Sequence, residues 1–240
     1  MNILMTIDVG NTNISLGLMQ GNEVIGSFRL TTKTPRTSDE FGLCIKELLD
    51  MTKLQEDDIE AVIISSVVPK IMYSLTSAIV KFLHKDPIIV GPGIKTGISI
   101  RTDNPREVGA DRIVDISMAY HTYHKSCIIV DFGTATTFDY ISGDGVFKYT
   151  VIAPGLGIVA NALTSQTAKL PEIEIQKPES ILNGNTITGM QAGVIYGYIG
   201  SVEYIIKQMK KELKLKDCLV IATGGLGKVI AKETKEIDLF

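Results

Sequence analysis

Two short segments of this chain resemble one another. Asp8-Val-Gly-Asn-Thr-Asn13 and Asp131-Phe-Gly-Thr-Ala-Thr-Thr137 each follow an apolar run, place Asp two residues before Gly, and continue with hydroxyl or amide side chains. The two aspartates are 123 positions apart in a chain of 240 residues. This spacing predicts a duplicated unit with one phosphate-binding turn in each half, facing across a shared cleft. A two-lobed ATP-dependent phosphotransferase can be built in this way.

The pattern of apolar and turn residues predicts the same order of elements in both halves. Each half begins with three strands and continues with helices and a further strand, β-β-β-α-β-α, and the two halves join within a helix of residues 107–125. A β-meander followed by βαβ crossovers indicates an α/β fold with mixed sheets covered by helices. We therefore expect two domains, residues 1–115 and 116–240. The expected strands are 2–8, 12–19, 23–31, 59–67, 88–90, 126–132, 135–142, 145–153 and 219–223. The main helices follow Ser38 and Pro69 or span 155–166 and 186–214.

Composition excludes several classes of function. With 45% hydrophobic and 21% charged residues, the chain should form a globular, soluble protein. A net charge of −3 gives no basic field for nucleic acid, so small molecules are the expected partners. The N-terminus lacks the features of a signal peptide and no apolar run is long enough to span a membrane, which predicts a cytoplasmic location. Three widely spaced cysteines indicate neither a disulfide framework nor a zinc site.

The first Asp-x-Gly segment lies where a strand should end. A glycine at position 10 permits the positive φ of a tight turn, so that successive N–H groups could converge on phosphate oxygens. The Asp8 carboxylate could hold Mg²⁺ directly or through water. An ordinary β-hairpin with an Asn-Thr turn is the alternative for this segment taken alone.

The second segment follows the same logic, and its alternative is a Thr-rich edge strand. Between the two lies Gly109-Ala-Asp-Arg112, which by itself could be a surface charge pair on a helix. A phosphotransferase also needs a group that accepts the proton of the acceptor hydroxyl and a cation that orients an anionic substrate, and Asp111 and Arg112 suit these roles. Gly224-Gly225-Leu-Gly227, before a helix, could pack under an adenosine or could be a simple turn.

Taken in order, these motifs resemble the type III pantothenate kinase family over essentially the whole chain. The set is Asp8-Val-Gly-Asn-Thr-Asn13, Gly91-Pro-Gly93, Asn104-Pro-Arg-Glu-Val-Gly-Ala-Asp-Arg112, Asp131-Phe-Gly-Thr-Ala-Thr136 and Gly224-Gly225-x-Gly227. The resemblance implies duplicated ribonuclease H-like lobes of the acetate and sugar kinase/Hsp70/actin superfamily and a homodimer. It also implies ATP-dependent phosphorylation of pantothenate to 4'-phosphopantothenate, the first step of coenzyme A synthesis, with Mg²⁺ and a monovalent cation such as K⁺ or NH4⁺.

The resemblance also implies roles for individual residues. Asp111 matches the general base, Asp131 the ligand of the monovalent cation, and Thr134 an ATP contact. Thr186 matches a substrate contact that the partner subunit can supply. Thr102 stands where related kinases often carry a Tyr that lines the pantothenate pocket, so this chain departs from the family pattern there. The first phosphate loop corresponds to Asp8, Val9, Gly10, Asn11, Thr12, Asn13, Ile14 and Ser15, and the pantothenate site to Gly109, Ala110, Asp111 and Arg112.

The same resemblance divides the work between the expected domains. It assigns the first phosphate loop and the pantothenate site to residues 1–115. It assigns the second phosphate loop, the adenosine side and the dimer contacts to residues 116–240. Two other functions remain open on the same fold: a non-catalytic regulatory binding protein, and a sugar or acetate kinase. Asp8, Asp111 and Asp131 argue against the former, and a test of alternative acceptors would separate the latter.

Overall fold

The computed structural model describes residues 2–91 and 93–240, which form two compact units. The first contains the chain up to Thr96 together with Pro105–Val114, and the second contains Gly97–Asn104 together with Asp115–Phe240. This division differs from the expected boundary at residue 115 in the placement of residues 97–104. The physical reason is β6 (Ser99–Ile100), which forms hydrogen bonds with β9 (Val146–Pro154) and so belongs to the second sheet.

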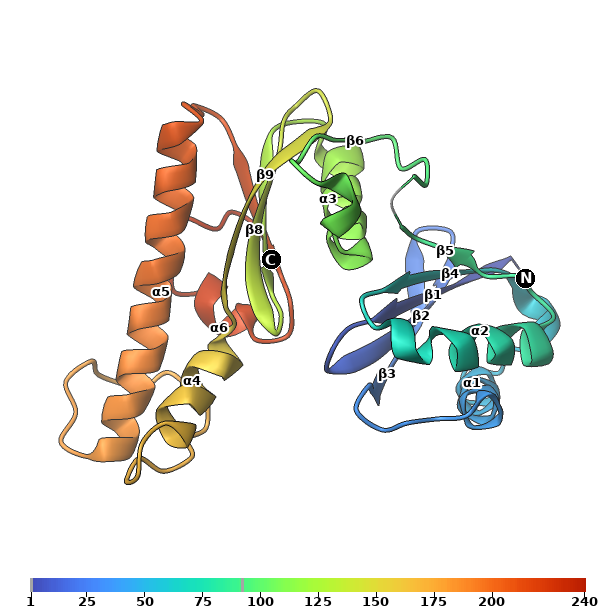
Figure 1. Ribbon diagram of the computed structural model, residues 1–240, viewed down its shortest axis with the longest axis horizontal. Coiled ribbons are helices and arrows are strands. Elements are labelled where there is room, and N and C mark those ends of the chain that lie inside the picture. Colours follow the sequence, from blue (N-terminus) through green and yellow to red (C-terminus); the bar gives the residue numbers. More distant parts are fainter. Residues whose placement is uncertain (1, 92) are drawn as a thin grey trace. The chain divides into compact units, whose positions relative to one another are not determined.

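The first unit is built on a five-stranded sheet in the order β3-β2-β1-β4-β5. β1 pairs antiparallel with β2 and parallel with β4, so the C-terminal ends of β1 and β4 meet at one edge. Helices α1 and α2 pack against each other beside this sheet (Figure 1). The elements are β1 (Ile3–Val9), β2 (Asn13–Gln20), β3 (Glu23–Thr31), α1 (Ser38–Met51), η1 (Glu56–Asp58), β4 (Ile59–Ser66), α2 (Pro69–Leu83) and β5 (Ile88–Ile89).

Alternating residues of β1 hold the first unit together. Ile3, Met5, Ile7 and Val9 are all nearly inaccessible to solvent and lie in one core cluster with residues of both helices. The cap of α1 differs by one position from the expected Ser38. The Thr37 hydroxyl accepts from the Glu40 N–H and the Glu40 carboxylate accepts from the Thr37 N–H, which forms a capping box.

The second unit has the sheet order β10-β7-β8-β9-β6. The long helix α5 runs along one face of this sheet, and α4 lies beside it (Figure 1). Phe138, Ile195 and Val202 are buried in the core between sheet and helices. The short helix η2 (Pro105–Glu107) belongs to the first unit, and α3 (Ala110–Tyr123) begins there and continues into the second. The other elements of the second unit are β7 (Cys127–Phe132), β8 (Ala135–Ile141), α4 (Leu156–Ser165), α5 (Thr186–Glu212), β10 (Leu219–Thr223) and α6 (Gly227–Ala231).

The two units repeat one topology. The strand order β3-β2-β1-β4 recurs as β9-β8-β7-β10, and each pair of neighbouring strands keeps the same sense, antiparallel, antiparallel and parallel. Asp8 is the penultimate residue of β1, and Asp131 is the penultimate residue of β7. The predicted α/β duplication is therefore confirmed. None of the helices within the described residues is long and apolar enough to cross a bilayer.

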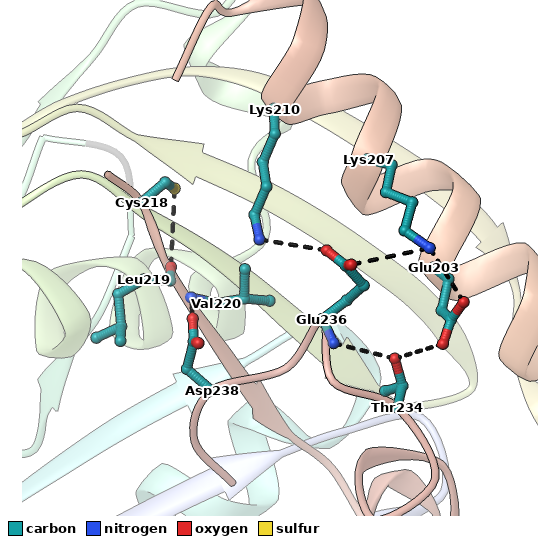
Figure 2. A network of polar contacts seen from close by, with 9 residues as sticks. All are labelled: Glu203, Lys207, Lys210, Cys218, Leu219, Val220, Thr234, Glu236 and Asp238. Carbon is teal, nitrogen blue, oxygen red and sulfur yellow. Dashed lines mark hydrogen bonds and ion pairs between the residues drawn. The ribbon is translucent and has the colours of Figure 1, made fainter. Parts of the chain in front are cut away.

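The last residues of the chain are fastened to the second unit (Figure 2). Asp238 accepts a hydrogen bond from the Val220 N–H at 2.8 Å, and Leu239 continues beside Ile221 in a parallel bridge. Glu236 forms ion pairs with Lys207 and Lys210 of α5, at 3.8 and 3.4 Å. The outer edge of β10 is therefore covered, and the strand that leads into the Gly224 turn is held from both sides.

Candidate functional site

The first aspartate lies at the C-terminal edge of the first sheet. Asp8 is exposed and is paired with Ser15 on β2 and with Ser65 on β4. Open α/β sheets bind ligands at this edge, where the strands end and the connections begin. The residues matched to the first phosphate loop therefore form the end of β1, the turn and the start of β2.

The turn after Asp8 differs from the expected tight turn whose successive N–H groups would converge on phosphate oxygens. Gly10 does not have a positive φ, and its N–H donates to the Asn13 carbonyl at 2.9 Å. The Gly10 carbonyl in turn accepts from the Thr32 hydroxyl at 2.7 Å. The positive φ predicted for Gly10 is therefore wrong, because this residue closes a hairpin between paired strands. Asn11 and Thr12 at the tip of this hairpin are exposed.

Asp8 and Asp111 belong to the same unit, and the charge of Asp111 acts on Asp8. Partial burial raises the pKa of the Asp8 carboxyl, the nearby Ser65 hydroxyl lowers it, and the negative charge of Asp111 raises it. Ser65 Oγ is close enough to affect the carboxylate, yet it lies outside normal hydrogen-bond geometry. The charge of Asp111, on α3, therefore acts on Asp8 at the end of β1, although the two residues are 103 positions apart in sequence (111 − 8).

The Asp111 carboxylate is held by the local backbone. Asp111 lies in the first turn of α3, and its Oδ1 accepts a hydrogen bond from the Arg112 N–H at 2.8 Å. The carboxylate folds back over Gly109, where a Cβ atom would lie only 2.4 Å from Asp111 Oδ1. A glycine at position 109 is therefore needed for this orientation of Asp111.

The second aspartate is enclosed by glycines within the second unit. A Cβ atom on Gly224 would lie 2.7 Å from Asp131 Oδ1, and one on Gly133 would lie 3.4 Å from Asp131 Oδ2. Gly224 has a φ of +98°, which side-chain-bearing residues rarely adopt. The turn that the sequence associates with adenosine is thus in contact with the aspartate of the second phosphate turn.

Thr134 lies in the second turn, against the start of α4. Its carbonyl accepts a hydrogen bond from the Gly155 N–H at 3.1 Å. A Cβ atom on Gly155 would lie 2.2 Å from that carbonyl oxygen, so only glycine fits. Sequence analysis missed Gly155, and the Pro154-Gly155 pair between a strand and a helix was the available signal.

Thr186 and Thr102, two further residues that the sequence singled out, lie in the second unit. Thr186 is the first residue of α5 in the second unit, behind the cap formed when Asn185 Oδ1 accepts from the Thr188 N–H at 3.0 Å. Thr102, also in the second unit, has a buried hydroxyl with no partner among the described residues. Of the predicted Gly91-Pro-Gly93 segment, Pro92 lies outside the described residues.

The donor groups fit hard cations. Within residues 2–91 and 93–240 there is no group of three or more metal-ligating side chains. Mg²⁺ in phosphotransferases is commonly held by one or two carboxylates together with substrate phosphates, and the Asp8 carboxylate could serve as such a ligand. Around Asp131 the donors are carboxylate, hydroxyl and backbone oxygens, which suit an alkali cation better than a soft metal.

Two hydroxyl residues lie on strands beside the aspartates. Sequence analysis missed Ser65, and it included Thr137 only as the last residue of the second Asp-x-Gly segment. Ser65 and Thr137 are the direct strand partners of Asp8 and Asp131. A polar Ser65-Ser66 pair at the end of the otherwise apolar strand 59–66 was the signal for the first of them. Sequence analysis did not single out Thr137 as the neighbour of Asp131, because threonine is common in strands.

Comparison with known families and relatives identifies close similarity over the whole chain. The family model for type III pantothenate kinase matches residues 4–208. A type III pantothenate kinase of Agathobacter rectalis is 50% identical over 238 residues, which is 99% of this chain and 92% of the relative. One from Bifidobacterium longum subsp. infantis is 46% identical, with 99% and 93% of the two chains covered.

Solved structures share the fold at low sequence identity. A 2-dehydro-3-deoxygalactonokinase-like protein of Sinorhizobium meliloti superimposes with a TM-score of 0.62 at 12% identity, covering 98% of this chain and 90% of that one. Acetate kinase of Porphyromonas gingivalis gives a TM-score of 0.57 at 9% identity, with 98% and 86% covered. These similarities confirm the acetate and sugar kinase fold.

Proposed function

Because this chain belongs to the type III pantothenate kinase family and phosphorylates pantothenate with ATP in coenzyme A synthesis, we propose that Asp111 is its general base. The observation that supports this role is the position of Asp111 in the first turn of α3, where the Arg112 N–H and the absence of a side chain at Gly109 fix the direction of its carboxylate. A carboxylate fixed in this way can accept the proton of the primary hydroxyl as the phosphoryl group is transferred.

The neighbours of Asp111 would bind pantothenate. Arg112 is proposed to pair with the pantothenate carboxylate, since a guanidinium offers two parallel donors to that group. Gly109 and Ala110 would line the same site. Thr186 would add a contact from the partner subunit. We assign these roles to the substrate. The segment from Asp8 to Ser15 would bind ATP together with Thr134 of the second unit. Only the exposed part of that segment can contact the nucleotide, because the side chains of Val9 and Ile14 are buried in the core.

The two units would accordingly bind different parts of the substrates. The first would carry the first phosphate loop and the pantothenate motif, and the second would carry the adenosine side, the second phosphate turn and the dimer contacts. When bound, Mg²⁺ would neutralise charge on the ATP phosphates. Asp8 would hold it and thereby offset the repulsion between the two carboxylates. Use of ATP at the start of coenzyme A synthesis supports a cytoplasmic location.

The test of this proposal is the release of ADP by purified protein. We expect ADP only when ATP, Mg²⁺, a monovalent cation and pantothenate are all present. Acetate and hexoses in place of pantothenate serve as controls for other kinases of this fold. ADP release that is indifferent to pantothenate would contradict the proposed substrate site.

Replacing Gly109 tests the orientation of Asp111. In Gly109→Ala the new Cβ displaces Asp111 Oδ1, so we expect kcat to fall by about 10- to 100-fold, as misplacement of a catalytic group by about 1 Å does. The melting temperature should change little, because the clash is with the free end of a side chain. Steady-state kinetics measures kcat, and thermal denaturation measures the melting temperature. A Gly109→Ala enzyme with normal kcat would show that this orientation is unimportant.

Asp131 is proposed to hold the monovalent cation. We expect Asp131→Asn to abolish the difference in rate between K⁺ and Na⁺ buffers, because the amide lacks the charge that attracts the ion. ADP release at fixed ionic strength, with KCl exchanged stepwise for NaCl, measures the effect. Asp144→Asn, which removes an exposed charge on the β8–β9 turn, is the control. Undiminished K⁺ activation in Asp131→Asn would place the cation elsewhere.

We further propose that the protein is a homodimer whose contacts include α5. Gly189, Gly193 and Gly197 recur every four residues, and a Cβ atom on any of them would meet nothing within 4 Å. Beside them is an apolar cavity of about 270 Å³, lined by residues that include Ala153, Val159 and Ser201. Small residues allow a second helix to approach closely, and an open apolar face favours association.

A bulky side chain on this face tests the dimer. Gly193→Leu should shift the protein to monomers in analytical ultracentrifugation, although leucine favours the helix itself by about 1 kcal/mol over glycine. Activity should fall with dimer content, since Thr186 would come from the partner. Lys211→Leu, at an exposed position near the end of α5, should leave the dimer intact. A fully dimeric Gly193→Leu protein would exclude this face from the interface.

A further inference from the structure

Buried hydroxyl groups without a hydrogen-bond partner are concentrated beside the two aspartates. The described residues contain three buried side-chain oxygen atoms of this kind, Ser65 Oγ, Thr137 Oγ1 and Thr102 Oγ1. A buried hydroxyl without a partner costs folding free energy, which an alanine or a valine would avoid. The fold itself therefore gains nothing from the hydroxyls of Ser65 and Thr137.

Strand register places these two hydroxyls next to the aspartates. Ser65 on β4 is the direct partner of Asp8 on the parallel strand β1, and Thr137 on β8 is the direct partner of Asp131 on the antiparallel strand β7. Directly paired residues project from the same face of a sheet. Ser65 is close enough to lower the pKa of Asp8, although it lies outside hydrogen-bond geometry. Active-site hydrogen bonds commonly tighten only when substrates bind.

The duplication repeats this arrangement. In the first unit, Asp8 is flanked by Ser15 and Ser65; in the second, Asp131 is flanked by Thr137 and Thr223. Hydroxyl residues thus occupy both neighbouring strands in each half, although the cores around them differ in composition. The hydroxyls are therefore associated with the duplicated turn and not with the packing of one unit.

We propose that Ser65 and Thr137 are positioning residues for the phosphotransfer reaction. When a cation is bound at the neighbouring aspartate, each buried hydroxyl donates a hydrogen bond to the carboxylate and fixes the direction of the oxygen atoms that face the cation. Ser65 serves the divalent site at Asp8, and Thr137 serves the monovalent site at Asp131. This inference rests on the proposed cation roles of the two aspartates.

Ser65→Ala and its neighbour Ser66→Ala form a matched pair. Ser65→Ala should keep or raise the melting temperature, yet weaken binding of Mn²⁺ in the presence of ATP by about 10- to 100-fold in electron paramagnetic resonance titrations, as loss of an outer-shell partner does. Its dependence on K⁺ should be normal. Ser66 Oγ accepts from the Val68 N–H at the start of α2, so Ser66→Ala should lower the melting temperature and leave Mn²⁺ binding unchanged.

Thr137→Val and Thr136→Val form the second pair. Thr137→Val should remove the rise in melting temperature that KCl produces relative to NaCl, and should raise the K⁺ concentration for half-maximal activity about tenfold. Its affinity for Mn²⁺ should be normal. The Thr136 hydroxyl is hydrogen-bonded to Tyr198 on the opposite face, so Thr136→Val should lower stability without changing either cation response.

Normal cation responses in Ser65→Ala and Thr137→Val would overturn the inference, and so would a loss of both responses in each variant. Normal Mn²⁺ affinity in Ser65→Thr would support the inference, because threonine keeps the hydroxyl group that alanine lacks. Asp8→Asn and Asp131→Asn test the cation roles of the aspartates separately from the positioning roles of Ser65 and Thr137. If these variants lose their cation responses while Ser65→Ala and Thr137→Val keep them, only this inference fails. If the aspartate variants bind cations normally, the proposed cation roles fail.

Discussion

Asp111→Asn is expected to lower kcat by about 10³-fold while the protein stays folded. General-base catalysis contributes about 10²- to 10⁴-fold to rate, and asparagine keeps the shape of aspartate but cannot accept the proton. The amide side chain could still occupy the position beside Gly109, so that substrate binding should change little. The expected pattern is therefore a fall in kcat with nearly unchanged KM for pantothenate, which is the signature of an interaction made in the transition state.

Two measurements accompany this variant. Thermal denaturation should give a melting temperature close to that of the parent protein or above it, because Asp111→Asn removes the repulsion between Asp111 and Asp8. Asp57→Asn, which removes an equivalent charge at an exposed position of η1, should have normal kinetics. If Asp111→Asn turns over at more than about a tenth of the normal rate, another group accepts the proton.

Gly224→Ala should have the largest effect on the second unit. The residue has a φ of +98°, and its Cβ would lie 2.6 Å from the backbone carbonyl of Phe132 and 2.7 Å from Asp131 Oδ1. Backbone strain and overpacking together should cost about 2 to 4 kcal/mol. For a chain of this length that lowers the melting temperature by about 5 to 10 °C. Displacement of Asp131 should also weaken ATP binding and K⁺ activation.

Gly225→Ala is the matched control in the same turn. A Cβ at position 225 would meet nothing within 4 Å, and Gly225 has no positive φ, so we expect the melting temperature to change by less than about 2 °C. Differential scanning calorimetry of both variants gives the comparison. Equal stability losses in Gly224→Ala and Gly225→Ala would contradict the steric argument, since they would make the identity of the glycine irrelevant.

Much of the fold could be predicted because its signals are local. Strand and helix patterns in each half predicted most elements within a few residues, and the two Asp-x-Gly segments predicted the duplication that the strand orders confirm. The prediction for the first turn failed because strand pairing and its hydrogen bonds decide the backbone conformation there. Gly10 has no positive φ because its N–H is bound by Asn13 in a hairpin whose other contacts come from Thr32.

The site could be predicted only in part for a similar reason. A motif names residue types at fixed spacing, which is enough to single out Asp8, Asp111 and Asp131. It does not say which residues of other strands lie next to them. Ser65 entered the site only through the pairing of β4 with β1, and only the pairing of β8 with β7 placed Thr137 directly opposite Asp131.

By itself, the sequence of this kinase determined the duplicated α/β plan and the two aspartate turns, because apolar periodicity and turn residues act over a few positions. The tertiary structure decided how each turn is built. It closed the Gly10 hairpin, brought the charge of Asp111 within range of Asp8, and packed Gly224 against Asp131. These contacts join residues up to about a hundred positions apart, and they depend on strand register and close packing, which no local pattern of residues specifies.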